Sequence, residues 1–122
     1  EAKKCMKSLI SNVPYSNKKL VSMDMEERYR LIISTILNAI GCQVEVEHML
    51  STGRIDIVAS TSRFIYVVEL KLTNNGGLNA AEKQIIDNGY LKPFLADGRK
   101  VIGLAVELDD MGKGLIDWKE VK

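Results

Sequence analysis

The stretch that decides the expected fold is Gly53-Arg-Ile-Asp-Ile-Val-Ala-Ser-Thr-Ser-Arg-Phe-Ile-Tyr-Val-Val-Glu-Leu-Lys-Leu72. It holds two runs rich in β-branched and aromatic residues, 54–59 and 63–72. A short polar segment, Ser60-Thr-Ser62, separates them. Such runs around a short polar connection predict two antiparallel strands joined as a hairpin.

Three charged residues interrupt these apolar strands, Asp56 in the first and Glu69 and Lys71 in the second. Strand alternation puts Glu69 and Lys71 on one face, where dry, unpaired charges would be costly. Because E-x-K occurs three times in the chain, the tripeptide alone fits an exposed strand end as well as a functional pocket. Asp56 favours the pocket, since opposite residues of paired strands lie within about 5 Å.

A carboxylate pair at this separation indicates a particular chemistry. The two charges repel each other unless a proton or a cation lies between them, and hard oxygen ligands suit Mg²⁺ or Mn²⁺. A lysine beside such an ion can orient a water molecule, help to deprotonate it, or face the charge of a phosphodiester. These residues therefore outline metal-assisted phosphodiester hydrolysis.

Upstream of the hairpin the pattern predicts a helix and a strand. The helix over 25–40 starts at the capping-box spacing of Asp24 and Glu27 and ends at Gly41. Strict alternation of apolar and polar residues over 43–50 predicts a strand with one buried face. This strand precedes the hairpin and completes a set of three.

Downstream, the residues 78–88 are rich in helix formers and precede Gly89, so we expect a second helix there. The continuous apolar run 100–106 predicts a strand inside the sheet, whereas 109–122 is left open with Trp118 as its large anchor. The order helix, three strands, helix, strand predicts an α/β fold with a mixed central sheet flanked by helices. The first three strands form an antiparallel meander, and a helical crossover reaches the fourth.

Composition limits the classes of protein. A chain of 122 residues, 46% hydrophobic and 27% charged, fits one soluble globular domain. With 17 basic and 16 acidic side chains the net charge is +1, so a phosphate backbone must be met by a local patch aided by a bound cation. Cys5, Cys42 and the single His48 lack metal-ligand spacing, so zinc is not expected. No membrane or signal segment is recognisable, and a cytoplasmic location is expected.

One string of motifs resembles a known family. Gly53-Arg-Ile-Asp56 is followed thirteen residues after Asp56 by Glu69-Leu-Lys71, and then by a helix that ends in Gln84-Ile-Ile-Asp-Asn-Gly-Tyr90. This resembles the PD-(D/E)XK nuclease-like domain found behind AAA-ATPase-like modules in many bacterial proteins, over roughly residues 10–118. The resemblance implies a restriction-endonuclease-like αβββαβ core. Ile55 replaces the proline of the family name, which supplies no ligand.

The resemblance implies roles for the residues of the E-x-K site. It makes Asp56 and Glu69 ligands of Mg²⁺ or Mn²⁺, and the backbone carbonyl of Leu70 a further ligand. Lys71 becomes the catalytic lysine.

It also adds residues from the helices and the first strand. Glu26 matches a glutamate that opens the first helix and becomes an accessory acidic residue, although an acidic side chain in a first helical turn also fits the helix dipole. Gln84 becomes a polar partner, although a solvated helix face explains it as well. Glu47 matches a recurrent acidic position before the G-R-x-D turn. Arg54 shares a face with Asp56 by strand parity and can pair with it or with a phosphate.

The N-terminal part resembles a lead-in. The chain begins with Glu1, and Val13-Pro-Tyr15 is similar to the family's connection from an upstream ATPase-like part. We therefore expect a lead-in segment over 1–22, from an upstream domain of a longer protein, and the nuclease-like domain over 23–122.

Three functional hypotheses follow. The first is a metal-dependent nuclease that acts on DNA or RNA. The second is a catalytically inert nuclease-like module that serves as a regulatory or interaction domain of a larger ATPase-like protein, which the near-zero net charge favours. The third is dimerisation through 43–50 if this strand lies at a sheet edge.

Overall fold

The computed structural model describes residues 24–122, and the expected lead-in over 1–22 lies outside the described residues. The elements in chain order are α3 (Met25–Ala39), β1 (Gln43–Leu50), β2 (Gly53–Ser60), β3 (Phe64–Leu72), the 3₁₀ turn η1 (Thr73–Asn75), α4 (Gly77–Asp87), the 3₁₀ segment η2 (Lys92–Asp97), β4 (Lys100–Leu108) and β5 (Leu115–Val121). The two helices and four strands expected from the sequence are confirmed. None of the helices in residues 24–122 combines the length and apolar character needed to cross a membrane.

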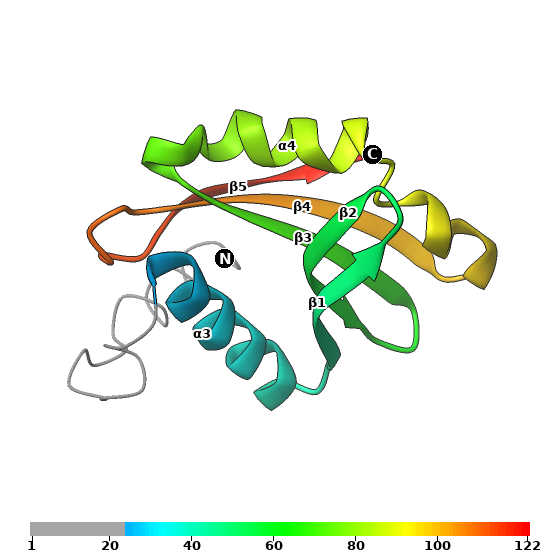
Figure 1. Ribbon diagram of the computed structural model, residues 1–122. Coiled ribbons are helices and arrows are strands. Elements are labelled where there is room, and N and C mark those ends of the chain that lie inside the picture. Colours follow the sequence, from blue (N-terminus) through cyan, green and yellow to red (C-terminus); the bar gives the residue numbers. More distant parts are fainter. Residues whose placement is uncertain (1–23) are drawn as a thin grey trace.

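The strands form one mixed sheet in the order β1-β2-β3-β4-β5. The pairs β1–β2, β2–β3 and β4–β5 are antiparallel, and β3–β4 is parallel, with α4 in the crossover. Figure 1 shows α4 along one face of the sheet and α3 on the other. The meander, the crossover and the interior position of β4 are confirmed. β1 lies at a sheet edge, so dimerisation through it stays a prediction.

Helix α3 has the boundaries that its sequence signals predict. Asp24 is the N-cap, and its Oδ1 accepts a hydrogen bond from the Glu27 amide at 2.8 Å. The helix ends before Gly41, which has a φ of 104° that a residue with a side chain rarely adopts. Tyr29 and Ile33 on the buried face pack against the sheet. These caps fix the first turn of α3, which carries Glu26.

Two apolar layers cover the two faces of the sheet. The layer beneath α3 joins this helix to residues of β2, β3, β4 and β5, and the layer beneath α4 joins that helix to the other face. Tyr90 belongs to the α4 layer and is fully buried. Trp118 packs partly buried against the α3 layer and is an anchor of the C-terminal segment, as expected.

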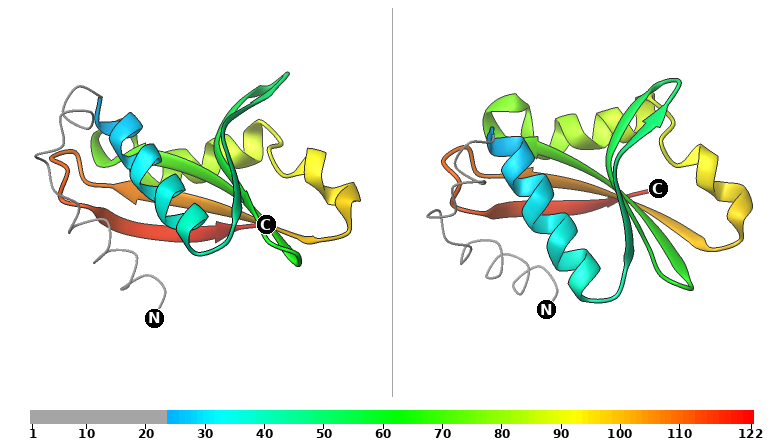
Figure 2. Two further views of the ribbon diagram at one scale, coloured as in Figure 1. Left: turned by 90° about the horizontal axis from the view of Figure 1, so that it is seen from below. Right: turned by 60° about the horizontal axis from the view of Figure 1, so that its bottom comes forward.

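Strand β2 twists sharply at Asp56. Ile55 and Ile57 have the same strand parity, yet Ile57 packs in the α3 layer and Ile55 in the α4 layer. The β2–β3 pairing nearest to Asp56 is Ile57–Val68, and Asp56, which precedes Ile57, has no paired partner on β3. Figure 2 shows the β1–β2 hairpin curling away from the rest of the sheet. Asp56 therefore lies where β2 separates from β3, and the gap between the diverging strands is available to side chains.

The hydroxyl of Tyr90 ties this hairpin to α4. It donates to the Arg54 carbonyl at 3.1 Å and accepts from Gln84 Nε2 at 3.1 Å and Asn88 Nδ2 at 3.2 Å. We expect Tyr90→Phe to lower the free energy of unfolding by about 1–3 kcal/mol, because it leaves buried polar groups without a partner. Urea denaturation measures this. Tyr66→Phe removes a hydroxyl from a half-buried ring of the sheet and should cost less than about 0.5 kcal/mol; equal losses in the two variants would contradict the role of the Tyr90 hydroxyl.

Candidate active site

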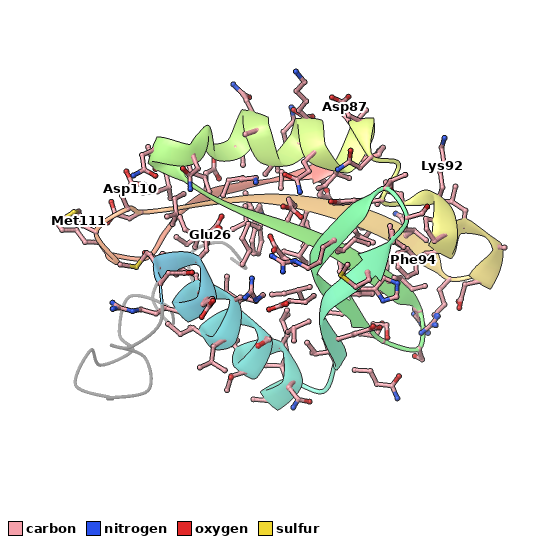
Figure 3. The ribbon with its side chains drawn as sticks, viewed as in Figure 1. Glu26, Asp87, Lys92, Phe94, Asp110 and Met111 are labelled. Atoms are coloured by element: carbon pink, nitrogen blue, oxygen red, sulfur yellow. The ribbon has the colours of Figure 1, made fainter. Side chains whose placement is uncertain are left out.

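A pocket of about 640 Å³ opens where α3, the β1–β2 hairpin, β3 and α4 meet. Figure 3 shows Glu26 on the first turn of α3. The structure brings together on the pocket wall all five side chains proposed from the sequence as site residues: Glu26, Asp56, Glu69, Lys71 and Gln84. Their convergence is a feature of the fold, and their roles stay predictions.

Each carboxylate oxygen of Asp56 faces a polar group of the protein. Its Oδ2 accepts a hydrogen bond from the Leu70 amide at 2.8 Å, at the level where the backbone of β2 no longer pairs with β3. Its Oδ1 lies 3.7 Å from Arg30 Nη1. Burial raises the pKa of Asp56, while the Leu70 hydrogen bond and the Arg30 charge act in the opposite direction.

The ion pair considered between Arg54 and Asp56 is not formed. Arg54 Nη1 lies 3.3 Å from Glu47 Oε2, and Arg30 provides the ion pair with Asp56 instead. Arg54 and Asp56 still line the same pocket, so strand parity predicted their common side correctly. The twist of β2 and the position of Glu47 explain the changed pairing.

Glu69 is the buried charged residue of the site, with 2% of its surface exposed. Lys71 Nζ lies 3.9 Å from its Oε2, whereas its Oε1 has no hydrogen-bond partner among the described residues. Burial, and next the charge of Asp56, raise the pKa of Glu69 to about 9, although Lys71 acts to lower it. Without a cation, burial and the charge of Asp56 therefore favour the protonated form of Glu69 at neutral pH.

The two accessory residues, Glu26 and Gln84, line the same pocket. Burial, and then the nearby charge of Asp56, raise the pKa of Glu26, so this carboxyl interacts with the site in addition to lying in the first turn of α3. Gln84 is half-buried and donates to the Tyr90 hydroxyl at 3.1 Å. The role of Gln84 as a polar partner in the site stays a prediction.

The residues present fit a hard divalent cation. In residues 24–122 no three His, Cys, Asp or Glu side chains are arranged to hold a metal ion by themselves. Mg²⁺, however, usually takes one or two carboxylates and keeps several waters, and Asp56 and Glu69 are of this kind. The unpartnered buried Oε1 of Glu69 is an oxygen that a cation would satisfy. Participation of the Leu70 carbonyl stays a prediction.

The element order and the paired carboxylates beside a lysine define a nuclease-like α/β domain. Residues 24–118 match the model of the PD-(D/E)XK nuclease superfamily. The chain belongs to this superfamily. No curated protein matches the sequence significantly.

Sequence reasoning missed Arg30 as a member of the site. Its side chain is 13% exposed and contacts both Asp56 and Glu47. The available signal was its position four residues after Glu26, because residues at this spacing share a helix face. Nothing in the sequence indicates the contact with Glu47, which depends on how β1 is shaped.

The metal-free protein should lose stability as the pH rises. The pKa of Glu69 is about 9 in the fold against 4.5 as its ordinary value, so the folded state binds more protons between these pH values. Stability from protonated Glu69 is complete below pH 4.5 and is lost as the pH rises towards 9. Glu69→Gln mimics the protonated form, and we expect it to be more stable than wild type by about 2 kcal/mol at high pH in EDTA, with a smaller difference at low pH.

Chemical denaturation across this pH range measures the effect. Glu120→Gln changes an exposed carboxyl and serves as the matched control, with no pH-dependent difference expected. A difference between Glu69→Gln and wild type that does not change with pH would contradict the protonation of Glu69.

Proposed function

We propose that this domain is a metal-dependent nuclease that hydrolyses phosphodiester bonds of DNA or RNA. The observation that supports this most is the pair Asp56 and Glu69 beside Lys71 in one pocket, with Glu69 Oε1 buried and unpartnered. A buried carboxylate pair of this kind requires a proton or a cation, and a hydrolytic site makes use of the cation.

In this proposal Asp56 and Glu69 hold Mg²⁺ or Mn²⁺, together with the carbonyl of Leu70. The bound ion supplies Lewis-acid stabilisation of the phosphate and lowers the pKa of a coordinated water. Lys71, which is 24% exposed, orients the attacking water and faces the phosphate charge. Glu26 extends the acidic wall and accepts a hydrogen bond from water in the pocket.

Two further pocket residues suit the substrate. Arg54 has 49% of its side chain exposed and can turn one side of its guanidinium to a phosphate while the other contacts Glu47. Gln84 offers an amide for a hydrogen bond to the sugar or base of the substrate strand.

The charge of the pocket makes the cation necessary for binding as well as for chemistry. Its carboxyl and basic side chains are three acids, Glu26, Asp56 and Glu69, and two bases, Arg54 and Lys71. While Glu69 is protonated, this wall has no net charge. A divalent cation that displaces this proton makes the wall net positive, which a phosphodiester requires. The net charge of +1 for the whole chain offers little other attraction.

The second candidate is an inert nuclease-like module that regulates or connects a larger ATPase-like protein in the cytoplasm. The low net charge favours it, because most nucleic-acid binders present a basic surface. The two proposals differ in metal binding, since a module without chemistry has no reason to bind Mn²⁺ at Asp56 and Glu69.

The test is cleavage of labelled single- and double-stranded DNA and RNA by the purified chain with Mg²⁺, Mn²⁺ or EDTA, and Mn²⁺ calorimetry on the same sample. We expect Mn²⁺ binding and cleavage that EDTA abolishes. Neither binding nor cleavage on any of the four substrates would favour the inert module.

A further inference from the structure

Arg30 links the candidate metal site to strand β1. It lies one helical turn after Glu26 on α3, and its side chain is 13% exposed. Its Nη2 is 2.8 Å from Glu47 Oε1, a strong ion pair, and its Nη1 is 3.7 Å from Asp56 Oδ1. The second distance exceeds a hydrogen bond, so Arg30 faces Oδ1 without occupying it.

Glu47 has an unusual backbone. Its φ of 55° is the only positive value for a non-glycine residue in residues 24–122, and such a conformation costs on the order of 1–2 kcal/mol. It falls between the pairs Val46–Ile57 and His48–Ile55, at the level of Asp56 across the hairpin. A strained residue persists where its surroundings hold it, and strain of this kind concentrates at functional sites.

The same glutamate binds two arginines. Its Oε1 contacts Arg30 at 2.8 Å and its Oε2 contacts Arg54 at 3.3 Å. The more buried arginine thereby lies next to Asp56 Oδ1, whereas the Leu70 amide holds the other carboxylate oxygen, Oδ2, at 2.8 Å. Each carboxylate oxygen of Asp56 thus faces a donor group.

We propose that Arg30, held by Glu47, is a positioning residue that orients Asp56 for cation binding. The inference rests on the proposed metal-dependent function and adds a residue to the support of that site. Supports of metal ligands typically change metal affinity by about 10- to 100-fold when they are removed.

A rival explanation predicts the opposite sign. If Arg30 only neutralised Asp56 in the metal-free protein, it would compete with the cation, and its removal would tighten metal binding. If Arg30 positions Asp56, its removal weakens binding despite the lost positive charge. The direction of the change therefore separates the two.

The experiment is Mn²⁺ calorimetry on Arg30→Met, Arg30→Lys and wild type, after denaturation curves show that each is folded. We expect Arg30→Met to bind Mn²⁺ about 10-fold more weakly. Arg30→Lys keeps the positive charge but lacks the planar guanidinium that contacts both Glu47 and Asp56. We therefore expect its Mn²⁺ affinity to be close to that of Arg30→Met. Arg63→Met removes an exposed charge in the β2–β3 connection and should bind as wild type does.

A readout in the metal-free protein accompanies this titration. The NMR shift of the Leu70 amide reports its hydrogen bond to Asp56, and we expect it to move in Arg30→Met and not in Arg63→Met. Glu47→Gln should reproduce most of both effects, and the double variant with Arg30→Met should be no weaker in Mn²⁺ binding than Arg30→Met alone.

Equal or tighter Mn²⁺ binding by Arg30→Met, or an unmoved Leu70 amide, would overturn the inference. A wild-type protein that does not bind Mn²⁺ would overturn the proposed function instead, and the two failures are therefore distinguishable.

Discussion

Lys71→Met should lower the rate of phosphodiester cleavage by about 1000-fold while Mn²⁺ binding stays equal or becomes tighter. Methionine keeps most of the apolar stem and removes only the ammonium, which lies 3.9 Å from Glu69 Oε2. Because Lys71 is not a proposed ligand, the loss falls on the orientation of water and on the charge that faces the phosphate. Single-turnover cleavage and calorimetry on the same preparation separate these effects.

The matched control for this variant is Lys83→Met, which removes an exposed lysine from α4. It should cleave at the wild-type rate. Cleavage at the same rate by Lys71→Met and Lys83→Met would remove Lys71 from the mechanism.

Asp56→Asn should weaken Mn²⁺ binding by at least about 100-fold and reduce cleavage to background. The asparagine oxygen can still accept the Leu70 hydrogen bond, so the local fold is kept, but the negative charge that attracts the cation is lost. Burial raises the pKa of the Asp56 carboxyl, because its charged form is disfavoured in the fold. Removal of this charge should therefore leave the metal-free protein at least as stable as wild type. Loss of binding in a protein of undiminished stability would then identify the charge as the cause.

Asp87→Asn is the control for this variant. Asp87 ends α4 and is exposed, and Figure 3 shows it on the side of the helix away from the sheet. Its replacement should leave Mn²⁺ binding unchanged. Undiminished Mn²⁺ binding by Asp56→Asn would place the cation elsewhere or nowhere.

The sequence predicted the fold well where local patterns are strong. The hairpin around Asp56 follows from two β-branched runs, and α3 follows from its cap and its glycine stop. Strand β5 was left open because the segment 109–122 as a whole is polar, and only the ends of Leu115–Val121 are buried. It pairs with one neighbour at the sheet edge, so local apolar periodicity carries little of the information that places it.

The sequence indicated the residues proposed for the candidate site, but not the contacts that hold them in place. Asp56 was the informative residue, because E-x-K recurs elsewhere in the chain. The contact of Arg30 with Glu47 could not be predicted, since it depends on a left-handed backbone at Glu47 that no residue type signals there. Pairing of Arg54 with Asp56, one of the two alternatives considered, is not formed because Glu47 contacts that arginine.

The most direct test of the proposed site is a cleavage time course with wild type, Lys71→Met and Asp56→Asn on DNA and RNA in Mn²⁺, then in EDTA, then with Mn²⁺ restored. We predict that wild type cleaves at least one substrate, stops in EDTA and resumes with Mn²⁺, and that both variants remain at background. Metal-independent cleavage by wild type, or cleavage by the variants at the wild-type rate, would contradict the assignment of Asp56, Glu69 and Lys71 as a metal-dependent nuclease site.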